Sequence, residues 1–308
     1  MKLIAILFAV VLGLCAANGV SADSIRVTLL GTGTPEPSPD RYGPSTLVEA
    51  GNVKLLFDVG RGATVRLAQA KVSLANITVF LTHLHSDHIN GLGDLWASGY
   101  MPPVFRKKPL KIFGPTGIAR LTDGLKMAYQ PDIDIRSAEL TARKLPFHLT
   151  GANFDATEVK RDGVVFDRGG VKVTAIRVKH AENKAFGYRV DYDGKSVVIS
   201  GDTGFTKNLI KMAKGADLII HEVMGVSDKQ MKNPLIKGIL TGHTTPEQAG
   251  TVFSKVQPKL AVYTHILLFG ISEKELVTKT RKRYSGPLIV GQDLMTFVVD
   301  DEVTIIKK

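Results

Sequence analysis

The sequence Thr82-His83-Leu84-His85-Ser86-Asp87-His88 places three histidines and one carboxylate within six residues. It directly follows the apolar run 77–81, which predicts a buried strand. Side chains two residues apart on an extended chain point to the same side, so His83 and His85 can bind one metal ion together. Asp87 and His88 come from the turn that must follow, and they predict a second ion nearby. Imidazole nitrogens combined with carboxylate oxygens favour zinc.

Three further polar residues follow predicted strands later in the chain. His180 ends the strand pattern 171–179, Asp202 comes after the strand 196–200, and His265 comes after the strand 260–264. The ends of strands in α/β sheets are rigid and face a common crevice, so these side chains are candidates for the remaining ligands. Asp202 can bridge both ions, because a carboxylate has two oxygens.

These pieces, from His83 to His88 and then His180, Ser200-Gly201-Asp202-Thr203 and His265, resemble the metallo-β-lactamase superfamily, within it the branch with ribonuclease Z and the zinc-dependent arylsulfatases. The resemblance implies an α/β fold, an αββα sandwich of two packed mixed β-sheets with helices outside. It also implies two Zn²⁺ ions per chain. One ion would be bound by His83, His85 and His180, and the other by Asp87, His88 and His265, with Asp202 between them.

Two segments point to the same branch. The strand pattern 216–222 ends in His221 and Glu222, and Gly242-His243-Thr244-Thr245 precedes a helix that Thr245 can cap. The resemblance implies that His243 faces the metals and protonates the leaving group, so Asp87 and His243 are the expected catalytic residues. His221 and Glu222 are expected to orient His243 or a ligand. The alternatives are a helix cap for His243 and a plain strand-end histidine for His221; His148 is interpreted as structural.

Basic residues give weaker signals. Arg41, in the loop 36–44, and Arg61, just before a predicted helix, are candidates for substrate contact. The formal net charge is +11, and it is +10 without Lys2. Such a surplus favours anionic partners. The basic runs 106–108 and 281–283 are interpreted mainly as solvated faces.

Residues 1–22 have the composition of a secretory signal peptide. Lys2 precedes a mostly apolar run up to Ala17, which is too short to span a membrane, and cleavage is expected after Ala22. A lipoprotein attached through Cys15 and an uncleaved anchor are the alternatives. Cys15 is the only cysteine, so the mature domain 23–308 needs a core in place of disulfides. We expect a periplasmic or secreted hydrolase domain without membrane attachment after cleavage, and a homodimer is a further expectation.

The functional prediction combines the motifs with the signal peptide. We expect an exported hydrolase that acts on small anionic esters of sulfate or phosphate. A hydroxide between the two ions would attack the ester, and His243 would act as the general acid. Ribonuclease Z enzymes with a long substrate-binding arm carry it between the third histidine and the bridging aspartate. Only 21 residues separate His180 from Asp202, so that arm is missing. The alternatives are a ribonuclease Z-type RNA phosphodiesterase and a non-catalytic periplasmic module that binds metal or nucleic acid.

The periodicity of the chain predicts several helices. They cover 62–71, 90–98, 116–129, 206–213, 246–256 and 272–283. Residues 130–170 are expected to form short strands and loops that border the site.

Overall fold

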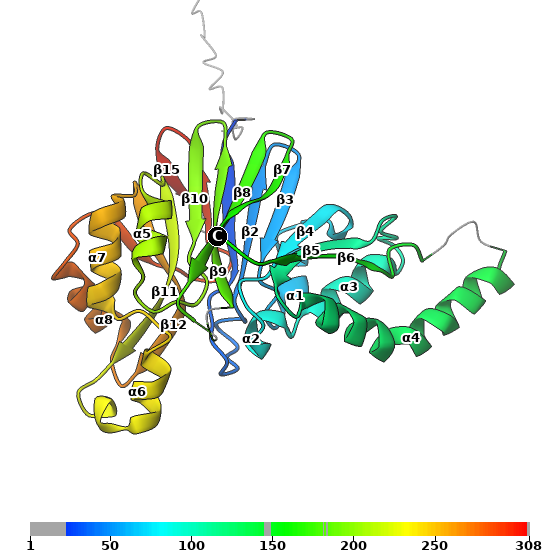
Figure 1. The fold of residues 1–308 in the computed structure, drawn as a ribbon. Helices are drawn as coiled ribbons and strands as arrows, with labels where there is room; N and C mark the ends of the chain where they lie inside the picture. The colour runs from blue at the N-terminus through cyan, green and yellow to red at the C-terminus, as the bar shows by residue number, and fades with distance from the viewer. Residues whose placement is uncertain (1–22, 145–148, 181, 183, 307–308) are drawn as a thin grey trace, which may run out of the picture.

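The computed structural model describes residues 23–144, 149–180, 182 and 184–306. The predicted signal peptide 1–22 and His148 lie outside the described residues. The described chain forms two β-sheets that pack face to face, with helices on the outside of both (Figure 1). This arrangement confirms the predicted αββα sandwich.

The first sheet has eight strands. In sheet order they are β15 (Val303–Ile306), β14 (Thr296–Val299), β1 (Ile25–Gly31), β2 (Ser45–Ala50), β3 (Val53–Phe57), β4 (Ile77–Phe80), β5 (Leu110–Pro115) and β6 (Phe154–Val159). The pairs from β15 to β3 are antiparallel, and those from β3 to β6 are parallel. The parallel half places the end of β4, where the histidine motif begins, inside the sheet instead of at its edge.

The second sheet has seven strands. In sheet order they are β13 (Leu288–Val290), β12 (Leu260–Phe269), β11 (Leu218–Val226), β10 (Lys195–Ile199), β9 (Ala185–Tyr192), β8 (Val171–Val178) and β7 (Gly163–Arg168). Strands β10 to β13 run parallel to one another, and β7 to β10 are antiparallel. The parallel strands bring Asp202, which follows β10, to the same edge of the sandwich as His265. The predicted strand end before His265 was wrong, because β12 continues through His265 to Phe269.

Aromatic side chains fill the space between the sheets. The ring of Phe80 lies 5.2 Å from that of Phe57, 4.9 Å from that of Phe113 and 5.5 Å from that of Tyr188. Tyr188, from the second sheet, donates a hydrogen bond of 2.8 Å to the carbonyl of Leu81. The core therefore holds the second sheet directly against the residues that precede the histidine motif.

Helices cover the outer faces of the sandwich. They are α1 (Ala63–Gln69), α2 (Ser86–Ile89), α3 (Leu92–Tyr100), α4 (Ile118–Ala142), α5 (Lys207–Ala213), α6 (Pro234–Leu240), α7 (Pro246–Val256) and α8 (Glu273–Arg281), with short 3₁₀ turns at Leu74–Asn76 and Gln230–Lys232. Thr245 caps α7 as predicted, because its side chain accepts from the N–H of Gln248. Within the described residues, no helix combines the length and the apolar character that crossing a bilayer requires.

Two predictions, the end of the helix expected over 116–129 and the exposure of Arg106 in the basic run 106–108, were wrong. Helix α4 does not end near residue 129 but continues through Pro131 to Ala142 and projects from the body (Figure 1). Pairs one turn apart support the extra turns, such as Arg136 with Asp132 at 2.8 Å. The second correction is Arg106, which is only 4% exposed and donates to the carbonyl of Leu95 instead of facing solvent.

Candidate metal centre

The structure brings the seven predicted ligands together at one edge of the sandwich. His83, His85 and His180 offer nitrogens that all lie within 4.8 Å of one another. Asp87, His88 and His265 form a second set with the same spacing. Within the sets, His85 Nδ1 lies 3.2 Å from His180 Nε2, and His265 Nε2 lies 3.2 Å from Asp87 Oδ2. The grouping is the predicted one, and the binding of zinc by these residues stays a prediction.

Asp202 lies between the two sets. Its Oδ2 is 3.8 Å from Nε2 of both His83 and His180 and 3.5 Å from Nε2 of His265. Its Oδ1 is 3.4 Å from Nε2 of His88. The carboxylate therefore reaches both sets, as a bridging ligand must.

The backbone before Asp202 requires glycine. Gly201 has φ of 58°, and a Cβ at this position would lie 2.8 Å from Cβ of Thr82. A side chain there would combine an unfavourable backbone angle with a clash. Gly201 thereby lets the end of β10 approach the histidine motif of the first sheet.

Asp58 is a site residue that the sequence analysis missed. It follows β3, and its Oδ2 lies 2.8 Å from Nδ1 of His88. The same carboxylate accepts from the N–H and the hydroxyl of Thr82, at 2.7 and 2.8 Å. The signal was available in the sequence, because Asp58 is a carboxylate that directly follows the apolar run 55–57, as Asp202 follows a strand. Its contact with His88 leaves the other ring nitrogen of that histidine facing the site.

Several ligand atoms in the site have no protein partner. Within the described part of the chain, Nε2 of His83, Nε2 of His88 and Oδ1 of Asp202 are buried and make no hydrogen bond. Buried polar atoms without a partner are costly, and a converging group of them needs an explanation. By contrast, the second ring nitrogen of His180 lies 2.7 Å from the carbonyl of Gly242. Lone pairs that converge on one space, with the opposite nitrogens held in place, fit a metal centre.

Burial and charge set the protonation of these groups. Burial lowers the pKa of His83 well below its ordinary value and lowers the pKa of His180 as well, which favours the neutral imidazole that binds metal. Burial also lowers the pKa of His88, but Asp202 and Asp58 outweigh it and raise the pKa well above its ordinary value. Burial raises the pKa of Asp202, and the nearby His265 and His88 bring it well below its ordinary value.

His243 lies beside both sets and is held by Glu222. Its Nδ1 is 3.2 Å from Oε2 of Glu222, while Oε1 of Glu222 accepts from the N–H of Thr244 at 2.7 Å. The His243 ring lies 5.0 Å from that of His180 and 5.8 Å from that of His265. Burial lowers the pKa of His243, but the hydrogen bond and charge of Glu222 raise it to about 9. Glu222 therefore fixes the ring and favours its protonated form.

The other three candidates have different surroundings. His221 is buried inside β11, which continues to Val226, so the predicted end of this strand at Glu222 was wrong. Its ring packs against Phe253, and its Nδ1 lies 2.6 Å from the carbonyl oxygen of Glu222, which favours a structural role. Arg41 donates to Thr32, to the carbonyl of Gly291 and to Glu273 at 2.6 to 2.8 Å. Its guanidinium thus ties a loop to the body, and its contact with substrate stays a prediction. Arg61 makes one bond of 3.1 Å, to the carbonyl of Pro35, and its substrate contact stays a prediction.

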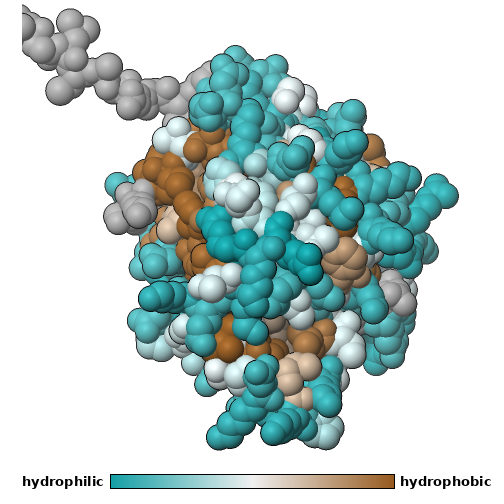
Figure 2. Space-filling view, turned by 90° about the vertical axis from the view of Figure 1, so that its left-hand side faces the viewer, coloured by the Kyte–Doolittle hydropathy of each residue, from teal (hydrophilic) through white to brown (hydrophobic). Residues whose placement is uncertain are grey.

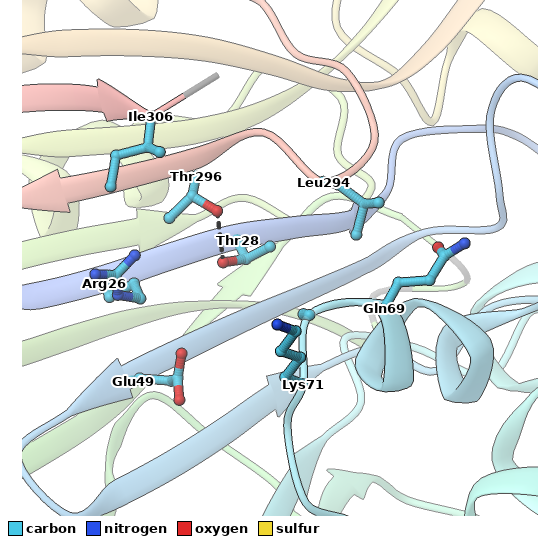
Figure 3. A pocket seen from close by; sticks show the side chains of 9 residues that line it. Arg26, Thr28, Glu49, Gln69, Lys71, Leu294, Thr296 and Ile306 are labelled. Carbon is cyan, nitrogen blue, oxygen red and sulfur yellow. Dashed lines mark hydrogen bonds between the residues drawn. The ribbon is translucent and has the colours of Figure 1, made fainter. Parts of the chain in front are cut away.

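A hollow elsewhere on the surface has a different lining. It lies over β1, β2 and β14 and is bordered by the end of α1 (Figure 3). Its lining residues are Arg26, Thr28, Glu49, Gln69, Ala70, Lys71, Leu294, Thr296 and Ile306. Thr28 and Thr296 satisfy each other across it at 3.0 Å. Its lining contains no histidine and lacks all seven candidate metal ligands.

The comparisons with known proteins agree with this fold and site. Residues 54–266 match the family model of the beta-lactamase superfamily domain. The chain belongs to the metallo-β-lactamase superfamily. Within it, the chain is 36% identical over 288 residues to a ribonuclease Z of Mycobacterium avium. This match covers 90% of this chain and 99% of the relative. A ribonuclease Z of Mycobacterium tuberculosis is 32% identical, with 88% and 96% covered.

Solved structures give the same result. The short form of human tRNase Z superposes with a TM-score of 0.65 at 26% identity, over 88% of this chain and 98% of that one. A metallo-β-lactamase fold protein of Bacillus subtilis, YhfI, superposes with a TM-score of 0.68 at 20% identity, over 90% and 100%. The predicted superfamily and its ribonuclease Z branch are thereby confirmed, and the chain is a metal-dependent hydrolase of ester bonds. The predicted arylsulfatase-like specificity finds no support among these relatives.

Proposed function

We propose that this protein is a dinuclear zinc phosphodiesterase of the ribonuclease Z type, which cleaves RNA. The sequence analysis placed this activity second, behind an exported hydrolase of small sulfate or phosphate esters. The relatives named ribonuclease Z support the reversed order. The missing arm no longer argues against it, because the match to the Mycobacterium avium relative runs almost end to end over 288 residues and leaves no room for a long insertion.

One arrangement carries the proposal. His243 lies beside two ligand sets that share Asp202, and it belongs to a cluster with His180 and Asp202 whose ligand atoms lie within 4.8 Å of one another. A proton donor in contact with a two-metal site is what phosphodiester hydrolysis needs, because the departing oxygen must gain a proton. Bound zinc would activate water and neutralise the charge of the phosphoryl group.

The chain's own residues perform the remaining tasks. Glu222 holds Nδ1 of His243, so Nε2 is the atom available to protonate the leaving oxygen. Glu222 is itself fixed by the N–H of Thr244. Of the seven predicted ligands, His85 is the exposed one, so the site is open to solvent on its side. A long polymeric substrate can approach from there.

A parallel assay tests the proposal. The zinc-loaded protein would be incubated with labelled precursor tRNA, bis(p-nitrophenyl) phosphate and p-nitrophenyl sulfate, next to the variant His83→Ala. We expect saturable cleavage of the RNA and turnover of the phosphodiester, both lost in the variant. Turnover of the sulfate ester without RNA cleavage would contradict the proposal.

A second candidate rests on the N-terminus. Residues 1–22 predict export, and maturation of tRNA occurs inside cells. An exported hydrolase of small anionic phosphate or sulfate esters therefore stays the competing proposal. The same three substrates separate the two candidates, because only one of them requires RNA cleavage.

A further inference from the structure

Strands β11 and β12 extend beyond their neighbours at the edge that holds the site. β10 pairs with β11 only up to Ile220, and β13 pairs with β12 only up to Tyr263. β11 and β12 remain paired with each other as far as Val226 and Phe269. Glu222 lies just past Ile220, the last residue of β11 that pairs with β10. Beyond this point, the outer halves of β11 and β12 form a two-stranded ribbon that projects from the catalytic edge (Figure 1).

The ribbon and helix α6 form a small unit that we call the ribbon lobe (residues 223–241 and 266–270). It has an apolar core of its own. Its residues are Met224, Val226 and Ile236, packed against Met231, Ile239, Leu240, Leu267 and Phe269. Asn233 caps α6, and Pro234 occupies its first position. The lobe is thus a packed wall beside the site, and side chains on its surface have defined positions.

The surface of the lobe is basic. Lys229, Lys232 and Lys237 are all exposed. Asp228 is the one acidic residue of the segment 223–241, and it is exposed as well. None of the three lysines forms an ion pair with a carboxylate of the described chain. Figure 2, which views the molecule from this side, shows hydrophilic side chains at the bottom, where Figure 1 places α6, with apolar ones next to them. Their charge is therefore available to an anionic partner.

The positive charge continues from the lobe past the site. The N–H of His243 donates to the carbonyl of Leu240 at 3.1 Å, so α6 runs directly into the predicted general acid. Gly204 lies between the end of the lobe and Lys179. A Cβ built on Gly204 would be 2.9 Å from the carbonyl oxygen of Thr241 and 3.4 Å from Cδ of Lys179. The end of the lobe and Lys179 are therefore neighbours, immediately beside His180.

A hollow extends this side of the site further. Lys179 and Lys207 both line it, and both are exposed. Neither lysine forms an ion pair with a carboxylate of the described residues. Its one acidic residue, Asp162, accepts from the N–H of Arg177 and from Asn208. The lobe that carries Lys229, Lys232 and Lys237 thus adjoins Lys179, and Lys179 shares a hollow with Lys207.

We propose that Lys229, Lys232, Lys237, Lys179 and Lys207 form a basic track that binds the phosphate backbone of an RNA substrate and guides it past His243. The inference rests on the proposed function, since it names how that site would hold its polymeric substrate. Lysine ammonium groups on phosphates release counterions, which makes such binding strongly salt-dependent and independent of base sequence.

The test measures RNA binding and small-substrate turnover separately. The variant Lys229→Gln/Lys232→Gln/Lys237→Gln removes the lobe part of the track, and Lys179→Gln/Lys207→Gln removes the other part. Binding of fluorescein-labelled precursor tRNA is followed by anisotropy from low to moderate salt. We expect the triple variant to bind at least tenfold more weakly at low salt and to reduce the slope of log K against log salt by about 2–3. Turnover of bis(p-nitrophenyl) phosphate should stay within about twofold.

The control has the same loss of charge far from the site. Lys172 is exposed near the start of β8, Lys214 directly after α5 and Lys255 near the end of α7. Each lies at the opposite end of its element from His180, Lys207 or His243, so Lys172→Gln/Lys214→Gln/Lys255→Gln should leave the slope unchanged. Equal effects of the two triple variants, or no RNA binding by the wild type at low salt, would overturn the track. RNA cleavage with unaltered binding would refute the track and leave the proposed function intact. RNA binding that depends on the track, without any RNA cleavage, would support the track and contradict the proposed function.

Discussion

Asp58 holds His88 in place across 30 residues of sequence, with 2.8 Å between Oδ2 of the carboxylate and Nδ1 of the ring. Asp58 also accepts from the N–H of Thr82, the residue before His83. One carboxylate therefore positions members of both ligand sets, although it contacts only one histidine itself. Groups of this kind fix the tautomer and the orientation of a metal-binding histidine.

Replacing Asp58 should therefore weaken metal binding. The variant Asp58→Asn keeps the size of the side chain but removes its charge, and we expect zinc affinity to fall about 10–100-fold. Competition of the protein with a chromogenic chelator measures this. Asp94→Asn, on the exposed face of α3, is the matched control. Asp58 also contacts Thr82, so thermal unfolding of the zinc-free variant separates loss of affinity from loss of fold; wild-type affinity would refute the positioning role.

His243 should matter most for poor leaving groups. In the variant His243→Ala we expect the zinc content to be unchanged and turnover of RNA to fall by roughly 10²–10⁴, because the departing alkoxide loses its proton donor. Nitrophenolate leaves without a proton, so bis(p-nitrophenyl) phosphate should be affected much less. The ratio of the two losses in kcat is the measurement. Equal losses for both substrates would show that His243 has another role.

Removal of zinc should abolish activity and lower stability together. The unpartnered nitrogens of His83 and His88 are buried, so the metal-free site has costly polar atoms. At a free zinc concentration about 100 times its Kd, binding would contribute about 2.7 kcal/mol to the free energy of unfolding. Thermal unfolding before and after treatment with a chelator measures the difference. Zinc should restore both properties and Mg²⁺ should not, since imidazole ligands disfavour Mg²⁺; full activity after exhaustive chelation would contradict a metal centre.

The N-terminus makes an independent prediction. If residues 1–22 are a signal peptide, the protein recovered from a bacterial periplasmic fraction should begin at Asp23. Intact-mass analysis of that fraction, compared with the cytoplasmic one, measures this. A cytoplasmic protein that retains Met1 would remove the argument for export and with it the main support for the small-ester candidate.

The sequence predicted which candidate ligands the structure brings together, because their signal is local. His83 and His85 lie two residues apart after an apolar strand, and Asp202 follows a strand of its own, whereas His265 lies inside β12, which extends beyond the predicted end at residue 264. Helix α7 began where Thr245 and Pro246 indicated. Helix α4 was predicted too short, because Pro131 usually ends a helix and the pairs that extend it, such as Asp132 with Arg136, are a weaker signal.

The sequence by itself determined which residues are candidates to bind metal and that strands precede or contain them, since periodicity and ligand type are properties of neighbouring residues. Only the tertiary structure decided that Asp87 meets His265, 178 residues away, that Asp58 holds His88, and that the ends of β11 and β12 leave the sheet as a basic lobe. Those relationships depend on how two sheets pack against each other. Their packing is set by the whole core between them, and no local stretch of sequence encodes it.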